Sequence, residues 1–421
     1  MPRTTVRLKP DTTGSVTRLA LFIVAASAAT IFGQAPATGV TVFEGARVIV
    51  GDARPPIENA SLVVSGARFV QVGRAADVRA PAGATHVSLA GKTVMPAIID
   101  THVHLSANRE KLIRDLKQRG YWGVSAAMSM GTDNLELMPM RNEVIPGAAR
   151  FFSAGRGITR KEPMRPTFQI ETEEEGRKAV RDNAALNVQI IKVWVDDREG
   201  KVQKVTPEQY AAVIDEAHKA GIRVSAHIFN MEDAKGLMRA NLDIFAHGVR
   251  DKDVDHETVA MFQQRPNLVL IPNLPDRGVK VDRSWLKPGM LADEFVKLEA
   301  ENIDRLPQVQ AFYGIQARNL AKMNAAGVRI TMGTDGNRPW GAHEEMEDMV
   351  LAGMTPAQVI LASTRNGAEL LRIADAGTLE AGKSADFIVL DGNPLDDITN
   401  TRKISSVILR GVAVDRSQPV P

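Results

Sequence analysis

Apolar positions along the chain change their pattern twice. From Gly39 to about Ala90, short β-type segments such as VTVFEGARVIV are separated by Gly and Asn turns, which predicts an antiparallel sheet. Apolar strands then alternate with helical stretches, and this alternation predicts βα units around a parallel sheet. After Arg372 the β pattern returns in GTLEAGKSADFIVLDGNPLDD and ISSVILRGVAVD.

The middle of the chain is expected to form an α/β fold, a (β/α)8 TIM barrel at residues 94–376. Two helices have clear start signals, because TPEQ at residues 206–209 and TPAQ at residues 355–358 each read as a capping box with Pro at the first helical position. A longer helical insertion is expected at residues 285–326. The eight strands are predicted at residues 94–105, 123–130, 149–155, 188–195, 222–228, 243–249, 268–274 and 329–335.

The β segments at the two chain ends, residues 39–93 and 377–416, contain too few strands at the C-terminal end for a separate domain. We therefore expect them to pair with each other and to build one small β-sandwich domain beside the barrel.

Residues 1–34 have the pattern of a secretory signal peptide, in which a basic segment precedes the apolar stretch LALFIVAASAATIFG. That stretch is short for a membrane span, although a retained anchor or buried helix is the alternative. The mature protein is therefore expected to be periplasmic or secreted, with no membrane span after processing. The chain has no cysteine, which excludes a lipid-modified N-terminal cysteine and disulfides. A net charge of +2 does not indicate a nucleic-acid partner.

The segment IIDTHVHL places His102 and His104 two residues apart at the end of an apolar run. Residues i and i+2 of a strand project from the same face. At the C-terminal end of a barrel strand that face opens on the active-site mouth, where two imidazoles can hold a divalent metal ion. The alternative is a pair of hydrogen-bonded core histidines.

Two further histidines, His227 and His247, also end predicted strands and lie one βα unit apart. The other four histidines are interpreted as surface or packing residues: His86, His218, His256 and His343. His343 is also kept as a substrate-binding candidate, because it follows the eighth strand.

Asp335 and Lys192 complete the candidate set. Asp335 follows the eighth strand, and the next helix begins only near Ala342, which favours a ligand or base over a helix cap. Lys192 lies within the continuous apolar run IIKVWV, typical of a strand buried on both faces. A buried ammonium is costly, whereas a carbamate formed with carbon dioxide is an anion able to bridge two metal ions. The alternative is a lysine whose long side chain reaches water at the rim.

Taken together, these positions resemble the amidohydrolase superfamily. His102 and His104 match the HxH motif of strand one, Lys192 the carboxylated lysine of strand four, His227 and His247 the histidines of strands five and six, and Asp335 the aspartate of strand eight. TVMPAIIDTHVH resembles the entry motif, with Ala97 in place of the usual glycine, and GTLEAGKSADFIVLDGNPLDD resembles the closing β motif. The likeness covers residues from about 40 to 415 and extends to the prolidase-like and imidazolonepropionase-related branch.

The resemblance implies two divalent metal ions, with zinc expected. His102, His104 and Asp335 would hold the more buried ion, His227 and His247 the more exposed one, and N6-carboxylated Lys192 would bridge them. A metal-bridging hydroxide would then attack the carbon of a C–N bond, with Asp335 as base and then acid. The substrate would be a small molecule with an amide, peptide or cyclic amide bond, as for a prolidase-like dipeptidase or an N-acyl amino acid hydrolase.

Substrate specificity depends on loops. We expect Arg156, Arg160 or Arg338 to bind a substrate carboxylate, the alternative being a solvated basic loop. Three other functions stay open: a mononuclear deaminase, for which Glu232 is the available glutamate; a lactone hydrolase; and a non-catalytic scaffold. The sequence leaves open a homo-oligomer.

Overall fold

The structure is a computed structural model that describes residues 39–162 and 165–420. The predicted signal peptide therefore lies outside the described residues. Within them, no helix has the length and apolar character needed to cross a membrane.

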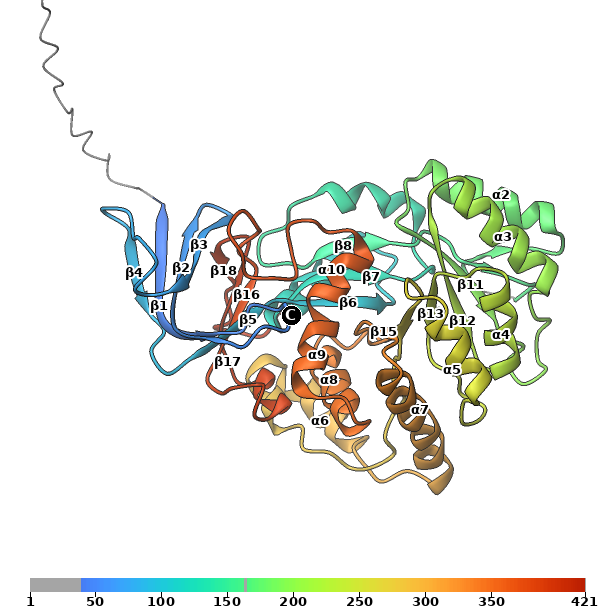
Figure 1. Cartoon of the computed structure of the whole chain (residues 1–421). Coiled ribbons are helices and arrows are strands. Elements are labelled where there is room, and N and C mark those ends of the chain that lie inside the picture. Colours follow the sequence, from blue (N-terminus) through green and yellow to red (C-terminus); the bar gives the residue numbers. More distant parts are fainter. Residues whose placement is uncertain (1–38, 163–164, 421) are drawn as a thin grey trace, which may run out of the picture. The chain divides into compact units, whose positions relative to one another are not determined.

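Both ends of the described chain contribute strands to one eight-stranded sheet, in the order β18-β17-β16-β5-β1-β2-β3 with β4 beside β1. Figure 1 shows β16 from the C-terminal part next to β5 from the N-terminal part, and the two pair antiparallel. This pairing is the one that the two β-type segments predicted, while their division into a separate sandwich domain stays a prediction. The strands are β1 Val40–Val48, β2 Ile57–Ser65, β3 Arg68–Arg74, β4 Thr85–Ser88, β5 Thr93–Pro96, β16 Phe387–Leu390, β17 Ile404–Leu409 and β18 Val412–Ala413.

The middle of the chain forms parallel strands in two groups, a three-stranded sheet and a seven-stranded sheet. All eight predicted strands are present in shortened form, but the first, predicted at residues 94–105, is divided: β5 belongs to the eight-stranded sheet and β6 to the parallel one. The two-residue strands β9 and β10 in the loop after β8 were not foreseen. The strand pairing gives two sheets and not one closed ring. The first sheet contains β6 Ile98–Val103, β7 Val124–Ser129 and β8 Arg150–Ser153; the second contains β10 Phe168–Gln169, β9 Ile158–Thr159, β11 Ile190–Val195, β12 Arg223–Ile228, β13 Ile244–Ala246, β14 Val269–Ile271 and β15 Arg329–Ile330.

Helices alternate with these strands, as the sequence predicted. The capping boxes at Thr206 and Thr355 are confirmed, because each hydroxyl accepts a hydrogen bond from the third backbone N–H of its helix. The expected insertion contains η2, α6 and α7. The helices are α1 Arg109–Tyr121, η1 Leu135–Asn142, α2 Glu173–Ala185, α3 Pro207–Lys219, α4 Met231–Arg239, α5 His256–Gln263, η2 Ser284–Gly289, α6 Ala292–Ala300, α7 Pro307–Ala325, α8 Gly341–Leu351, α9 Pro356–Ser363, α10 Arg365–Leu371 and η3 Ile398–Arg402.

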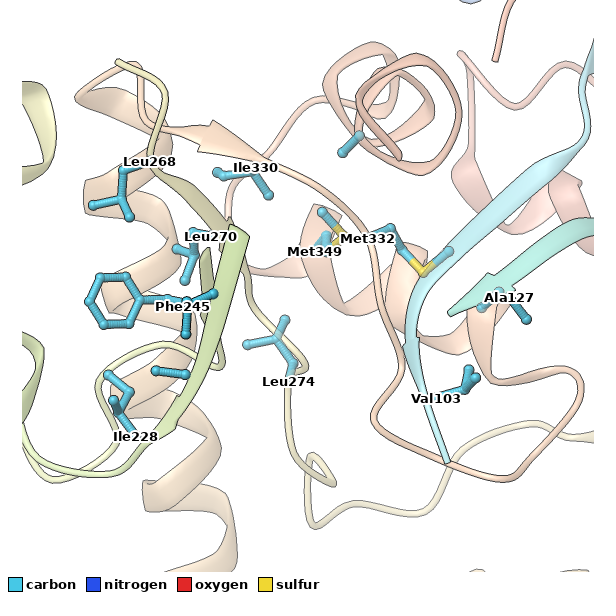
Figure 2. Packing of buried hydrophobic residues seen from close by; sticks show 14 of the residues in the cluster. Val103, Ala127, Ile228, Phe245, Leu268, Leu270, Leu274, Ile330, Met332 and Met349 are labelled. Atoms are coloured by element: carbon cyan, nitrogen blue, oxygen red, sulfur yellow. The ribbon is translucent and has the colours of Figure 1, made fainter. Parts of the chain in front are cut away.

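The parallel strands separate two hydrophobic clusters because successive side chains of a strand point to opposite faces. The outer cluster joins strand residues such as Phe245 and Leu270 to the helices, and Figure 2 shows part of it. The inner cluster draws residues from both parallel sheets and from α10: Ile99, Met128, Ile190, Ile244, Ile271 and Leu370. Both sheets therefore face one common interior.

Candidate metal centre

A β-bulge in β6 turns the histidine pair toward that interior. Between the pairs Asp100↔Ala127 and Val103↔Ser129, β6 advances three residues while β7 advances two. Ile99 belongs to the inner cluster and Val103 to the outer one, so strict alternation from Ile99 would have pointed His102 outward. The extra residue restores His102 and His104 to the inner face.

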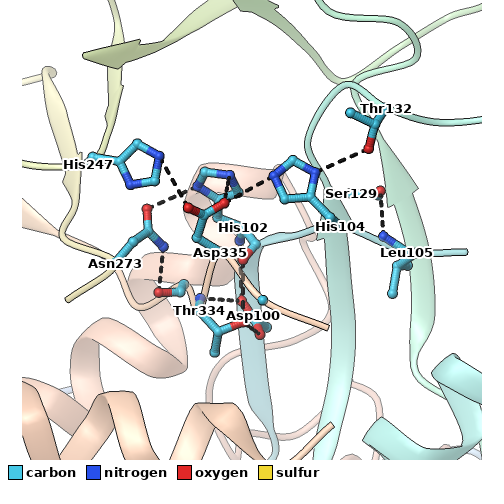
Figure 3. A network of polar contacts seen from close by, with 12 residues as sticks. Asp100, His102, His104, Leu105, Ser129, Thr132, His247, Asn273, Thr334 and Asp335 are labelled. Carbon is cyan, nitrogen blue, oxygen red and sulfur yellow. Dashed lines mark hydrogen bonds and ion pairs between the residues drawn. The ribbon is translucent and has the colours of Figure 1, made fainter. Parts of the chain in front are cut away.

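Asp335 stands among three imidazoles (Figure 3). Its Oδ1 lies 3.0 Å from His104 Nε2 and 3.1 Å from His102 Nε2, and its Oδ2 lies 3.4 Å from His247 Nε2. Donor atoms of His102, His247 and Asp335 all lie within 4.8 Å of one another. Asp335 has a left-handed φ of 51°, and its backbone N–H donates to the carbonyl of His102, which fixes the carboxylate against β6.

His227 joins the group through its neighbour, since the rings of His227 and His247 are 4.6 Å apart. Its Nε2 lies 3.0 Å from Asp196 Oδ2. With Asp196 ionised, Nε2 is the donor, and Nδ1 of His227 keeps the free lone pair. Asp196 was not foreseen as a partner, although VWVDD places it directly after β11.

Lys192 is buried in the middle of β11, as the apolar run predicted, and the alternative of a side chain reaching water is wrong because its exposed fraction is 0%. It shares the inner face with Ile190. Its Nζ has no hydrogen-bond partner among the residues the structure describes. Burial lowers the pKa of Lys192 to about 7, and the positive charge of Arg250 acts in the same direction.

Burial also keeps His102, His227 and His247 neutral, which is the form that binds a metal ion. It lowers the pKa of His102 to about 4 and that of His227 to about 3. The pKa of His247 falls well below its ordinary value for the same reason.

Two polar residues that sequence reasoning missed hold the centre together. Asn273 accepts a hydrogen bond from His102 Nδ1 at 3.0 Å and donates to the Gly333 carbonyl at 2.6 Å, so the free nitrogen of His102 is Nε2. Asp100 accepts from the backbone N–H groups of His102 and Thr334, tying β6 to the turn that carries Asp335. Their signal in the sequence was a polar residue within one apolar strand, Asp100 in β6, and another just after a second, Asn273 after β14.

The three arginines that were predicted to bind a substrate carboxylate lie in different surroundings. Arg338 is half exposed and lines a cavity of about 450 Å³ together with Thr334 and Gly336, the neighbours of Asp335. Arg160 is bound to Gln203 and Gln209. The backbone N–H and carbonyl of Arg156 bond to the side chain of Asn183.

His343 does not belong to the site, which corrects its reading as a substrate contact. It is buried, and both ring nitrogens are used: Nδ1 bonds to Thr401 Oγ1 at 3.1 Å and Nε2 donates to the carbonyl of Trp122 at 2.9 Å. His343 therefore connects α8 to η3 and has no nitrogen left for a ligand.

The chain is similar to several known proteins. Ochratoxinase of Aspergillus niger is 25% identical over 419 residues, covering 85% of this chain and 82% of that protein. Imidazolonepropionase of Deinococcus radiodurans is 25% identical over 390 residues, covering 84% and 92%. The crystal structure of a putative prolidase from Bifidobacterium longum superposes with a TM-score of 0.75 at 28% identity, covering 91% and 96%.

One relative matches over a shorter region. An uncharacterized protein of Mycobacterium tuberculosis is 25% identical over 209 residues, which is 44% of this chain and 53% of that protein, so the chain spans about half the length of this relative. The family model described as "Amidohydrolase family" matches residues 93–414. Because these residues make up most of the chain and include all six candidate ligands, the chain belongs to the amidohydrolase family.

Proposed function

We propose that this protein hydrolyses C–N bonds of small amides, a class that includes dipeptides, N-acyl amino acids and cyclic amides, with the help of two divalent metal ions. The buried Nζ of Lys192 carries the proposal, because it has no partner in the described part of the chain and lies on the interior face with the histidines. A charged amine in that position costs free energy. Conversion to a carbamate would replace it with an anion suited to two cations.

The remaining buried polar atoms fit a metal centre. His102 Nε2 and both ring nitrogens of His247 are buried without a hydrogen-bond partner among residues 39–162 and 165–420. We infer that His102, His104 and Asp335 would hold one ion, that His227 and His247 would hold the second, and that Lys192, once carboxylated, would be a ligand to both. Imidazole ligands suit zinc. When bound, two such ions would lower the pKa of a water molecule and polarise the substrate carbonyl.

Asp335 is the residue of the chain that we assign to proton transfer. Burial opposes its ionisation, but its interactions with His247, His102 and His104 hold the pKa of Asp335 well below its ordinary value. The carboxylate is therefore ionised at neutral pH and can accept a proton at Oδ. Its side chain is 31% exposed, so the same oxygen can pass that proton to the nitrogen of the leaving amine.

The relatives support an amide or peptide bond as the target, since the names ochratoxinase, imidazolonepropionase and prolidase all denote hydrolases. The cavity beside Asp335 has a volume within the range typical of small-molecule sites. We also propose that the parallel strands close into a barrel around the centre. Backbone hydrogen bonds from Thr101 N–H to the Met332 carbonyl and from Gly157 N–H to the Gly131 carbonyl support that closure.

A mononuclear deaminase is less well supported. Its glutamate would have to reach the metal-bearing interior, but Glu232 is exposed in the first turn of α4. A lactone hydrolase would use the same centre, and only substrates distinguish it from an amidase.

Metal analysis combined with a substrate panel tests the proposal. The purified protein should contain two divalent ions per chain and should hydrolyse members of a panel of dipeptides, N-acyl amino acids, cyclic amides and lactones. Lys192→Ala should lose metal and activity, whereas Lys219→Ala, which removes an exposed lysine from α3, should keep both. Metal-stripped protein should regain activity faster with zinc and bicarbonate than with zinc alone.

Other results would contradict it. One ion per chain, unaffected by Lys192→Ala, would favour the deaminase. A folded protein that binds no metal ion and hydrolyses nothing would favour a scaffold, and hydrolysis of lactones alone would move the function away from amides.

A further inference from the structure

Three arginines lie near the candidate ligands, and their ion pairs differ. Arg165 Nη1 donates to Glu162 at 2.9 Å and 3.1 Å, and its guanidinium stacks 4.3 Å above the Trp194 ring. Arg198 Nη1 donates to Asp196 at 3.0 Å. Arg250, in contrast, has no carboxylate within 4.0 Å in the part of the chain that the structure describes.

The backbone fixes Arg250 at the mouth of the interior. It follows His247 by three residues, and its N–H donates to the carbonyl of Phe229, which follows His227 by two residues. Arg250 is thus anchored between the ends of β12 and β13, directly beyond two candidate ligands.

The side chain of Arg250 is partly buried, and its Nε is buried without a hydrogen-bond partner among the described residues. A guanidinium in such a place keeps its charge, and an unpaired, partly desolvated cation is unfavourable. Arginine presents a planar pair of N–H groups that matches a carboxylate. A bound anion would therefore supply the partner that Arg250 lacks among the described residues.

We propose that Arg250 binds the carboxylate of the substrate, so that the protein acts on N-acyl amino acids or dipeptides with a free carboxylate on the carbon next to the scissile nitrogen. This inference rests on the proposed function. Arg250 is a better candidate than Arg160, which Gln203 and Gln209 occupy, and than Arg338, which is half exposed beside Glu344.

Paired substrates give a direct test. For the best N-acyl amino acid of the panel, kcat/KM is measured for the free acid and for its carboxamide in four proteins: the metal-loaded wild type, Arg250→Ala, Arg250→Lys and Lys252→Ala. Lys252 is the matched control, because it lies on the same loop, carries the same charge and is half exposed. Melting curves confirm that each variant is folded.

We expect Arg250→Ala to lower kcat/KM for the free acid by about 10- to 150-fold, the range for hydrogen bonds to a charged group, mainly through KM. The carboxamide should change little, and Arg250→Lys should recover part of the loss. Equal losses for acid and carboxamide, or no loss for either, would overturn the assignment.

A binding measurement separates this inference from the proposed function. Calorimetry compares N-acetyl-L-alanine with N-acetyl-L-alaninamide on the metal-loaded wild type and on Arg250→Ala. Preference for the acid that disappears in Arg250→Ala supports the anchor even if the protein hydrolyses no amide. Hydrolysis of amides without any preference for the acid would overturn the anchor and leave the proposed function intact.

Discussion

The contact between Asn273 and His102 gives the sharpest prediction for the candidate centre. Asn273 is buried, and its amide makes two hydrogen bonds, accepting from His102 Nδ1 at 3.0 Å and donating to the Gly333 carbonyl at 2.6 Å. Substitution by alanine leaves a buried donor and a buried acceptor without partners. It also places alanine at a φ of 47°, a left-handed conformation that asparagine tolerates better.

The expected cost follows from these contacts. Each unpaired buried group costs about 1–3 kcal/mol, and the left-handed backbone adds about 1–2 kcal/mol. Asn273→Ala should therefore lower the free energy of unfolding by about 3–8 kcal/mol, a large part of the roughly 5–15 kcal/mol typical of a native protein. Because His102 also loses the partner that orients its ring, the affinity for zinc should fall about 10- to 100-fold.

Two assays separate these effects. Denaturant unfolding of the metal-free protein gives the stability change, and competition with a chromophoric chelator gives the affinity for zinc. Asn273→Gly is the matched control: it loses the same hydrogen bonds without the backbone penalty, so it should be about 1–2 kcal/mol more stable than Asn273→Ala with equally weakened zinc binding. Wild-type zinc affinity in both variants would refute the reasoning.

Three further predictions each concern one residue: the pH dependence of stability at Lys192, and substitutions of Gly333 and His343. Between pH 7 and 10.5, the unfolding free energy of the metal-free protein should rise by at most about 1.4 kcal/mol per pH unit. The reason is that burial lowers the pKa of Lys192 to about 7 in the folded protein, while the unfolded chain keeps the proton. If the unfolding free energies of the wild type and of Lys192→Met change with pH in parallel, this prediction is wrong. Gly333→Ala should destabilise by about 1–3 kcal/mol, because the added Cβ would lie 2.8 Å from His102 Cβ. Gly336→Ala, whose Cβ meets nothing closer than 3.6 Å, should melt like wild type, and equal melting shifts would disprove the contact. His343→Ala should cost about 1–3 kcal/mol with kcat/KM unchanged, and a selective loss of activity would return this histidine to the site.

The sequence by itself determined the elements and the chemistry they carry. Capping boxes at Thr206 and Thr355 start helices because their hydrogen bonds are local. The apolar run around Lys192 predicted a strand buried on both faces, and the side chain is buried. The placement of His227 and His247 at the ends of β12 and β13 followed from the same alternation of strands and helices.

The tertiary structure decided the direction and the partners of those side chains whose contacts lie far away in the sequence. The bulge that turns His102 inward arises only when β6 pairs with β7. Asn273 orients His102 across 171 residues of sequence, and the unpaired state of Arg250 depends on which carboxylates the folded chain brings near it. Local pattern fixes which residues a strand presents, whereas facing direction, hydrogen-bond partners and charge neutralisation are properties of the packed chain. For that reason His343, at the start of a helix after the eighth strand, resembled a site residue in sequence and is a packing residue in the fold.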